Sequence, residues 1–203
     1  MPVTAPLRVV ELLAARLCHD LISPVAAIAN GAELLGEDDP DFVREAVTLV
    51  NSSAREANAR LQFFRFAYGF GGGGLAGPAP HLLATEYFSG SATRCDYGEA
   101  ARALPLAAQK LACVMLLVAG QALPRGGRLV VGAGPGGPVV DAIGDATSLP
   151  TELRAALAQE TDLDELTTRT VPACFAGLLT AEQGRILVAA GRPGGFRLAA
   201  MLP

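Results

Sequence analysis

The chain has 203 residues, of which 51% are hydrophobic and 18% are charged, and its formal net charge is −4. A chain this apolar and this weakly charged is not an intrinsically disordered protein, because disorder accompanies low hydrophobicity and high net charge. The acidic balance also argues against a nucleic-acid-binding protein, which needs a basic face to displace phosphate counterions. The length is sufficient for one large domain or two small ones.

Neither a membrane segment nor a disulfide or zinc framework is predicted. The longest apolar run, from Leu111 to Leu123, is shorter than the ~20 residues that cross a bilayer. Charged residues interrupt the N-terminal segment, so we expect no signal-peptide core there. The four cysteines are scattered and form no CxxC pair. Scattered cysteines without a CxxC pair are typical of a reduced, cytoplasmic protein without a metal site of its own.

Residues 1–69 are poor in glycine and predict a helical hairpin. Gly36 suits the residue that follows the end of a helix, Asp39 suits the N-cap of the next helix, and Pro40 suits its first position. We therefore expect a tight turn between two long helices.

Both arms of this hairpin carry apolar or small residues at alternating steps of three and four. This spacing is typical of a coiled-coil-like seam. A lone hairpin cannot bury the apolar faces of two such helices, so we expect a homodimer whose hairpins form a four-helix bundle. The seam residues are Val10, Ala14, Leu17, Leu21, Pro24, Ile28, Gly31 and Leu35 in the first arm, and Val43, Val47, Val50, Ala54, Ala57, Leu61, Phe64 and Tyr68 in the second.

The Gly- and Pro-rich stretch 70–80 predicts a linker, and residues 81–203 predict a second domain. Helices interspersed with paired strands favour a two-layer α/β sandwich, so the whole chain is α+β. The glycine-rich run 132–137 lies between two expected strands and is a hairpin turn rather than a dinucleotide loop. The expected strands are 82–88, 127–131, 138–143, 185–190 and 196–201, and the expected helices are 105–121, 150–159 and 172–182.

His19 is the residue with the most evident chemistry. If Leu17 and Leu21 face the seam, His19 occupies an outward position and its imidazole points to solvent. A neutral ring nitrogen is a nucleophile, and the adjacent Asp20 carboxylate can orient the other N–H and favour the cationic product.

Neighbouring residues of the same helix support this interpretation. Arg16 and Ser23 lie three residues before and four residues after His19, so both lie on the same face of the helix as His19. Pro24 removes a backbone N–H and is expected to bend the helix just below His19, which gives a partner room to approach.

The run HDLISP at residues 19–24 resembles the phosphoacceptor box of sensor histidine kinases, H-[E/D]-x-x-[T/N]-P, on the first helix of their dimerisation domain. The resemblance implies that His19 is the phosphorylated residue and that Asp20 assists the transfer. Ser23 stands where kinases have Thr or Asn, and by the same resemblance it contacts a water or a phosphoryl oxygen.

The C-terminal domain resembles the ATP-binding domain of these kinases, the Bergerat or GHKL fold, without its nucleotide-binding residues. Val118 stands where a kinase Asn holds Mg²⁺, and an apolar side chain is no ligand for a hard cation. In the D-x-G-x-G nucleotide loop, Asp141 matches the aspartate and Ile143 replaces the first glycine. We therefore expect the fold without ATP binding and without a cofactor of its own.

A phosphoacceptor hairpin followed by such a domain is similar to the ChpT family of alphaproteobacterial histidine phosphotransferases. The resemblance implies transfer from the receiver domain of a hybrid kinase (CckA-like) to His19, and then to response regulators (CtrA-like and CpdR-like). The receiver would supply Mg²⁺. Ile22 and Ala26 are expected to form the nonpolar centre of the docking surface, with Arg16 and Arg169 as further contacts.

Three other functions stay open from the sequence. One is a non-catalytic dimeric scaffold or adaptor with a kinase-like fold, which would not need His19. The second is an atypical histidine kinase, and the third is an anti-sigma-type regulator, both of which would bind ATP.

Overall fold

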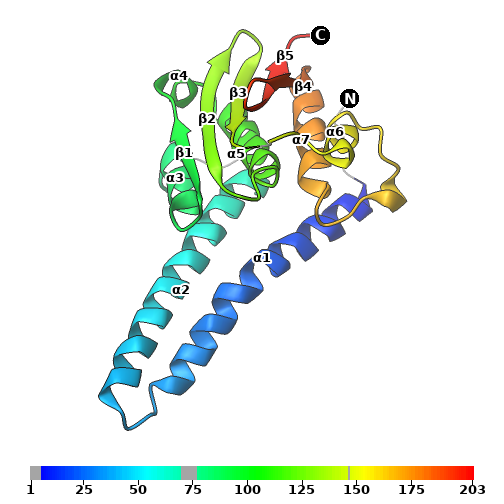
Figure 1. Cartoon of the computed structure of the whole chain (residues 1–203). Coiled ribbons are helices and arrows are strands. Elements are labelled where there is room, and N and C mark those ends of the chain that lie inside the picture. The colour runs from blue at the N-terminus through cyan, green and yellow to red at the C-terminus, as the bar shows by residue number, and fades with distance from the viewer. Residues whose placement is uncertain (1–5, 70–76, 146) are drawn as a thin grey trace.

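The computed structural model describes residues 6–69, 77–145 and 147–203, and two long antiparallel helices form its N-terminal part (Figure 1). These helices are α1 (Leu7–Leu34) and α2 (Pro40–Tyr68). Asp39 caps α2, because its carboxylate accepts from the Asp41 N–H at 2.8 Å, and Pro40 takes the first helical position. The predicted hairpin and its turn are confirmed.

The helix α1 bends part-way along its length (Figure 1). Its C-terminal half lies beside α2, whereas its N-terminal half leans on the C-terminal part of the chain. The partners there are the 3-10 turn η1 (Leu163–Glu165) and the helix α7 (Val171–Glu182). The bend expected from Pro24 is therefore present.

The seam prediction is correct for only part of α1. In the N-terminal half the buried residues are Val9 and Leu12, whereas the predicted Val10 and Ala14 are exposed. This half faces η1 and α7 instead of α2, and the bend changes which side of the helix is covered. Further along, Pro24 and Gly31 are buried as predicted. Gly31 lets the helices approach closely, because an added Cβ would lie 2.7 Å from Val50 Cγ2.

The C-terminal part is the predicted two-layer α/β sandwich, built on a five-stranded sheet in the order β1-β2-β3-β5-β4. β1 pairs with β2 in parallel, and the remaining neighbours are antiparallel. Helix α5 covers one face of the sheet together with α7 (Figure 1). The remaining elements are α3 (Pro80–Ser89), β1 (Thr93–Tyr97), α4 (Glu99–Arg102), α5 (Leu106–Gly120), β2 (Gly127–Gly134), β3 (Gly137–Ile143), α6 (Thr151–Leu157), β4 (Ile186–Arg192) and β5 (Gly195–Met201).

The strand expected at 82–88 is wrong, because this segment is the helix α3. Pro80 occupies its first turn, where proline favours a helix. Leu83, Ala84 and Phe88 share its buried face at helical spacing. The first strand of the sheet is instead β1, whose residues alternate between buried and exposed. β1 was not predicted from the sequence, because it is short and two of its five residues are charged.

One hydrophobic core joins the hairpin to the sandwich. Its cluster includes Val9 of α1, Phe63 of α2 and every residue of α5 from Leu111 to Ala119. Phe63 stacks on Tyr87 of α3 with ring centroids 4.4 Å apart. Of the expected linker 70–80, residues 70–76 lie outside the described residues, and Pro80 already belongs to α3.

The helix α1 is long and apolar enough to cross a membrane by length and composition. A helix that pairs in a bundle passes the same test, because both environments select for apolar residues. The few buried positions of α1 pack on α2 and α7.

Candidate functional site

His19 lies on the outer surface of α1, and its side chain is 77% exposed. The Asp20 carboxylate beside it is only 12% exposed. His19 Nδ1 lies 3.1 Å from Asp20 Oδ1, which is hydrogen-bonding distance. With an ionised carboxylate as acceptor, Nδ1 carries the proton and Nε2 keeps its lone pair. The site therefore presents a nucleophilic ring nitrogen to solvent.

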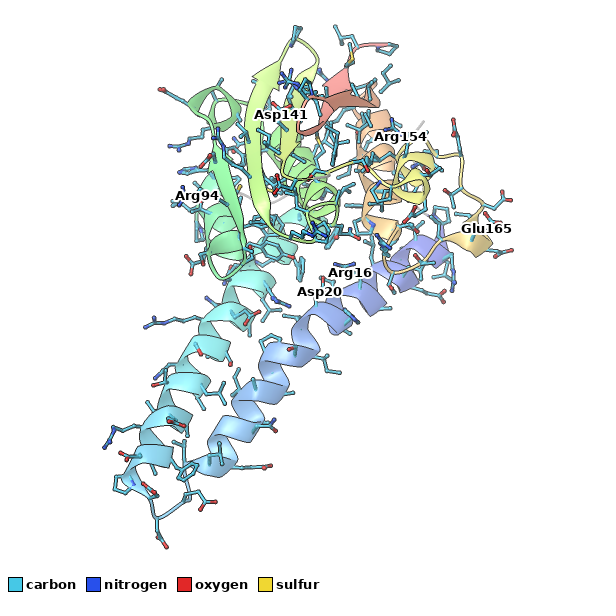
Figure 2. All side chains as sticks on the ribbon, viewed as in Figure 1. Arg16, Asp20, Arg94, Asp141, Arg154 and Glu165 are labelled. Atoms are coloured by element: carbon cyan, nitrogen blue, oxygen red, sulfur yellow. The ribbon has the colours of Figure 1, made fainter. Side chains whose placement is uncertain are left out.

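Arg16 holds the same carboxylate from the other side. Its Nε donates to Asp20 Oδ2 at 2.7 Å, and its Nη1 donates to the backbone carbonyl of Thr168 at 3.4 Å. Arg16 and Asp20 both point from α1 toward the C-terminal part (Figure 2). The guanidinium therefore connects Asp20 to the loop that precedes α7.

Arg60 of α2 binds the backbone of Asp20. One of its guanidinium nitrogens donates to the Asp20 carbonyl, and the other donates to the Glu56 carboxylate. In an α-helix this carbonyl accepts from the N–H four residues later, which here would be Pro24, and proline has none. Arg60 thus satisfies the acceptor that Pro24 leaves open. The sequence-based prediction did not include Arg60, although a proline four residues after Asp20 signals a free carbonyl.

Two tyrosines lie under the site. Burial and, to a smaller extent, the nearby Asp20 charge together raise the pKa of Tyr87 to about 12. Burial likewise raises the pKa of Tyr68, with a smaller contribution from Asp20. Both rings are therefore neutral near pH 7, and Tyr68 also packs edge-on against Phe175 of α7. The base of the site is thus an aromatic contact between the two parts of the chain.

The other predicted residues of α1 share one exposed stripe with His19. Ile22, Ser23 and Ala26 follow it by three, four and seven residues, which places them on the same helix face. Ile22 is 69% exposed. This face combines a nucleophile, a hydroxyl and apolar surface without a covering segment of the described chain.

Arg169 lies apart from this stripe on the loop before α7. Its side chain is exposed and forms a loose ion pair with Glu152, with Nη1 and Oε1 3.7 Å apart. It directly follows Thr168, whose carbonyl contacts Arg16. The backbone contact with Arg16 thus belongs to the residue before Arg169, and the Arg169 side chain pairs with Glu152 instead.

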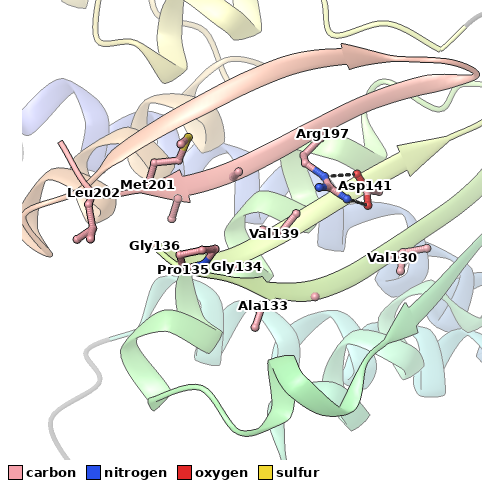
Figure 3. Close-up of a pocket in the computed structure, with 13 residues that line it drawn as sticks. Val130, Ala133, Gly134, Pro135, Gly136, Val139, Asp141, Arg197, Met201 and Leu202 are labelled. Atoms are coloured by element: carbon pink, nitrogen blue, oxygen red, sulfur yellow. Dashed lines mark hydrogen bonds and ion pairs between the residues drawn. The ribbon is translucent and has the colours of Figure 1, made fainter.

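Val118 and Asp141, which match residues of a kinase nucleotide site, lie on opposite sides of the sheet. Val118 is fully buried in the core. Asp141 projects from the opposite face of the sheet, where Arg197 binds its carboxylate at 2.6–2.7 Å (Figure 3). Arg192 also donates to this carboxylate, at 2.7 Å. The Arg197 and Arg192 hydrogen bonds hold the pKa of Asp141 below its usual range. Among the described residues no group of three or more His, Cys, Asp or Glu is arranged to hold a metal ion.

A groove of about 650 Å³ lies on this outer face of the sheet (Figure 3). Apolar residues such as Val130, Val139 and Met201 line most of it, and the Asp141–Arg197 pair supplies its charge. The groove contains no nucleophile and lies on the side of the sheet away from α5. It is therefore distinct from the site around His19.

Comparison with known proteins identifies the family. Residues 81–192 match the model of the histidine phosphotransferase C-terminal domain. Protein phosphotransferase ChpT of Brucella abortus (strain 2308) is 45% identical over 137 residues, which cover 64% of this chain and 64% of that protein. A solved structure described as a bacterial phosphotransferase matches 98% of this chain and 99% of its own, at 32% identity and a TM-score of 0.79.

The chain therefore belongs to the family of ChpT-type histidine phosphotransferases. The family and the α+β architecture expected from the sequence are confirmed. The match spans less than two thirds of the Brucella protein's length.

Proposed function

We propose that this protein is a histidine phosphotransferase of a two-component phosphorelay and that His19 carries the phosphoryl group. The observation that supports this most is the exposed imidazole whose Nδ1 lies 3.1 Å from a covered carboxylate. Membership of the ChpT-type family supports the same assignment. The protein acts between a donor receiver domain of a hybrid kinase and acceptor receivers of response regulators, with CckA-like, CtrA-like and CpdR-like partners.

The transfer is an in-line displacement at phosphorus. Nε2 of His19 forms a bond to phosphorus as the acyl-phosphate oxygen of the receiver aspartate leaves as a carboxylate. Asp20 holds the Nδ1 proton and stabilises the positive charge that develops on the ring. Such transition states are loose, so positioning and charge stabilisation supply most of the catalysis. The receiver brings the Mg²⁺, and the protein uses neither ATP nor a cofactor of its own.

The same proposal includes the assembly and the cellular location. Val47 and Leu61 are large seam residues of α2 that stay exposed in one chain, and a second hairpin would cover them. A homodimer with a four-helix bundle is thus the proposed functional form. The proposal also places it in the cytoplasm, bound neither to nucleic acid nor to a membrane. The exposed stripe of Ile22, Ser23 and Ala26 docks the receiver beside His19.

The decisive experiment is transfer from a phosphorylated receiver domain to the purified protein. Wild type should acquire a phosphate that is labile in acid and stable in base, and His19→Ala should not. His81, the second of the two histidines, provides the matched control, because it lies in α3 and His81→Ala should be labelled like wild type. An unlabelled wild type supports the scaffold function, and labelling by ATP alone supports a kinase. Either result would overturn the proposal.

A further inference from the structure

We propose that Arg16 is a positioning residue for the phosphotransfer: its guanidinium holds the Asp20 carboxylate in the orientation that aligns His19. This inference rests on the proposed function of His19. It differs from the sequence-based expectation, which assigned Arg16 to contact with the partner.

The hydrogen bonds form a continuous chain across the carboxylate. Arg16 Nε donates to Oδ2 of Asp20 at 2.7 Å, and Oδ1 of the same group lies 3.1 Å from His19 Nδ1. Because each oxygen has a separate partner, the guanidinium fixes the plane of the carboxylate and thereby the direction of the bond to the ring. Charge-assisted bonds of this kind are short and directional.

The exposure of the three side chains separates a positioning role from a docking role. Arg16 is 21% exposed and Asp20 is 12% exposed, whereas His19 is 77% exposed. A carboxylate covered to this extent needs a cation nearby, because removing a charge from water is costly. Arg16 supplies that cation from below, and His19 alone of the three presents its side chain to an approaching receiver.

The guanidinium is itself held in place. Its Nη1 donates to the Thr168 carbonyl at 3.4 Å, so it is anchored to the C-terminal part as well as to α1. The other nearby guanidinium, Arg60, is engaged by the Asp20 carbonyl and by Glu56. Among the described residues, Arg16 is thus the guanidinium that binds the Asp20 carboxylate.

Loss of Arg16 leaves the carboxylate free to rotate away from His19. The Nδ1–H tautomer is then less favoured, and a smaller fraction of the rings presents Nε2 as the nucleophile. We expect Arg16→Ala to lower the transfer rate at saturating phosphorylated receiver by on the order of 10- to 100-fold. The receiver concentration at half-saturation should change little.

The test compares Arg16→Ala, Arg16→Lys, Asp20→Asn and the double variant Arg16→Ala/Asp20→Asn. If Arg16 acts through Asp20, its removal has little further effect once Asp20 is Asn. Lysine keeps the charge but not the planar pair of donors, so Arg16→Lys should recover part of the rate. Arg8→Ala, which removes the same charge from an exposed position of α1, is the matched control and should behave like wild type.

A second measurement does not depend on transfer. Nitrogen-15 NMR of His19 in the free protein reports the tautomer of the ring. Arg16→Ala should shift the tautomer equilibrium away from Nδ1–H. Thermal unfolding verifies that each variant is folded. A raised half-saturation with an unchanged maximal rate would assign Arg16 to docking and overturn the inference. Multiplicative losses in the double variant, or an unchanged tautomer, would also overturn it. An unlabelled wild type refutes the proposed function instead, and the NMR result still decides the role of Arg16.

Discussion

At the scale of single residues, Asp20 carries two different tasks. Its carboxylate lies between His19 and Arg16, and its backbone carbonyl is bound by Arg60. The motif around His19 was predictable from sequence, because Arg16, His19 and Asp20 lie within about one helix turn. The contribution of Arg60 was not, because it lies 40 residues away on α2.

The hydrogen bond from Arg60 to the Asp20 carbonyl predicts that substitutions of Arg60 and Pro24 have non-additive effects on the free energy of unfolding. Arg60→Ala should lower the free energy of unfolding by about 1–2 kcal/mol, because the Asp20 carbonyl loses its donor. In a Pro24→Ala background the loss should be clearly smaller, since the new N–H of residue 24 can serve that carbonyl. Urea unfolding of the four proteins measures both values. Equal losses in the two backgrounds would contradict the pairing.

The ion pairs of Asp141 with Arg192 and Arg197 predict that the stability of the protein depends on pH in the acidic range. Hydrogen bonds from Arg197 and Arg192 lower the pKa of this carboxyl in the folded state. The unfolded chain therefore binds the proton more readily, so this contribution is present above the usual pKa of an aspartate and is lost as pH falls through the folded value.

Asp141→Asn should cost about 1 kcal/mol at pH 7, because the arginines are partly exposed. As the pH falls, the free energy of unfolding of this variant should decrease less steeply than that of wild type. Unfolding measured across pH 2–7 tests this, and parallel curves for the two proteins would contradict it.

At the scale of elements, α7 is held by close contact with the end of α6. A Cβ added at Gly177 would lie 2.5 Å from the Leu157 carbonyl and 2.4 Å from Gln159 Nε2. Gln159 adopts a positive φ of 60° and donates to the carbonyls of Ala156 and Cys174. The glycine therefore permits the approach that places the loop before α7, and with it Thr168, beside Arg16.

Gly177→Ala should destabilise the protein by about 1–3 kcal/mol, because backbone atoms must move to admit the methyl group. Gly90→Ala is the matched control: nothing lies within 4 Å of the added atom, and the change should be close to neutral. Thermal unfolding of both variants measures the difference. Equal melting temperatures for the two variants would show that α6 and α7 adjust freely.

At the scale of the whole molecule, the hairpin and the sandwich act as one packed unit in the described chain. The core runs from Val9 and Phe63 into α5, and Tyr68 meets Phe175 at the junction. Lys110 adds a hydrogen bond to the Gly69 carbonyl at the end of α2. The loop before α7 is therefore fixed relative to His19, as a positioning role for Arg16 requires.

The exposed seam residues of α2 predict how the chain assembles. Leu61→Asp and Val47→Asp should convert the proposed dimer to a monomer, because each places a charge in an apolar bundle interface. Ser52→Asp, at an exposed position outside the seam, should leave the dimer intact. Sedimentation of the three variants and wild type measures the mass in solution. A monomeric wild type would contradict the four-helix bundle.

The sequence by itself determined the helical hairpin, the sandwich and the exposed His19 beside Asp20, because caps, apolar periodicity and a short motif are local signals. It did not determine that the N-terminal half of α1 leaves α2 and packs on α7, or that residues 82–88 form a helix. Only the tertiary structure decided these points, and it also brought Arg60 and Thr168 to Asp20. Such contacts join residues that are far apart in the chain, and their energy depends on which groups are buried together. The composition shows that the chain is apolar and weakly charged, but it does not specify which residues those are.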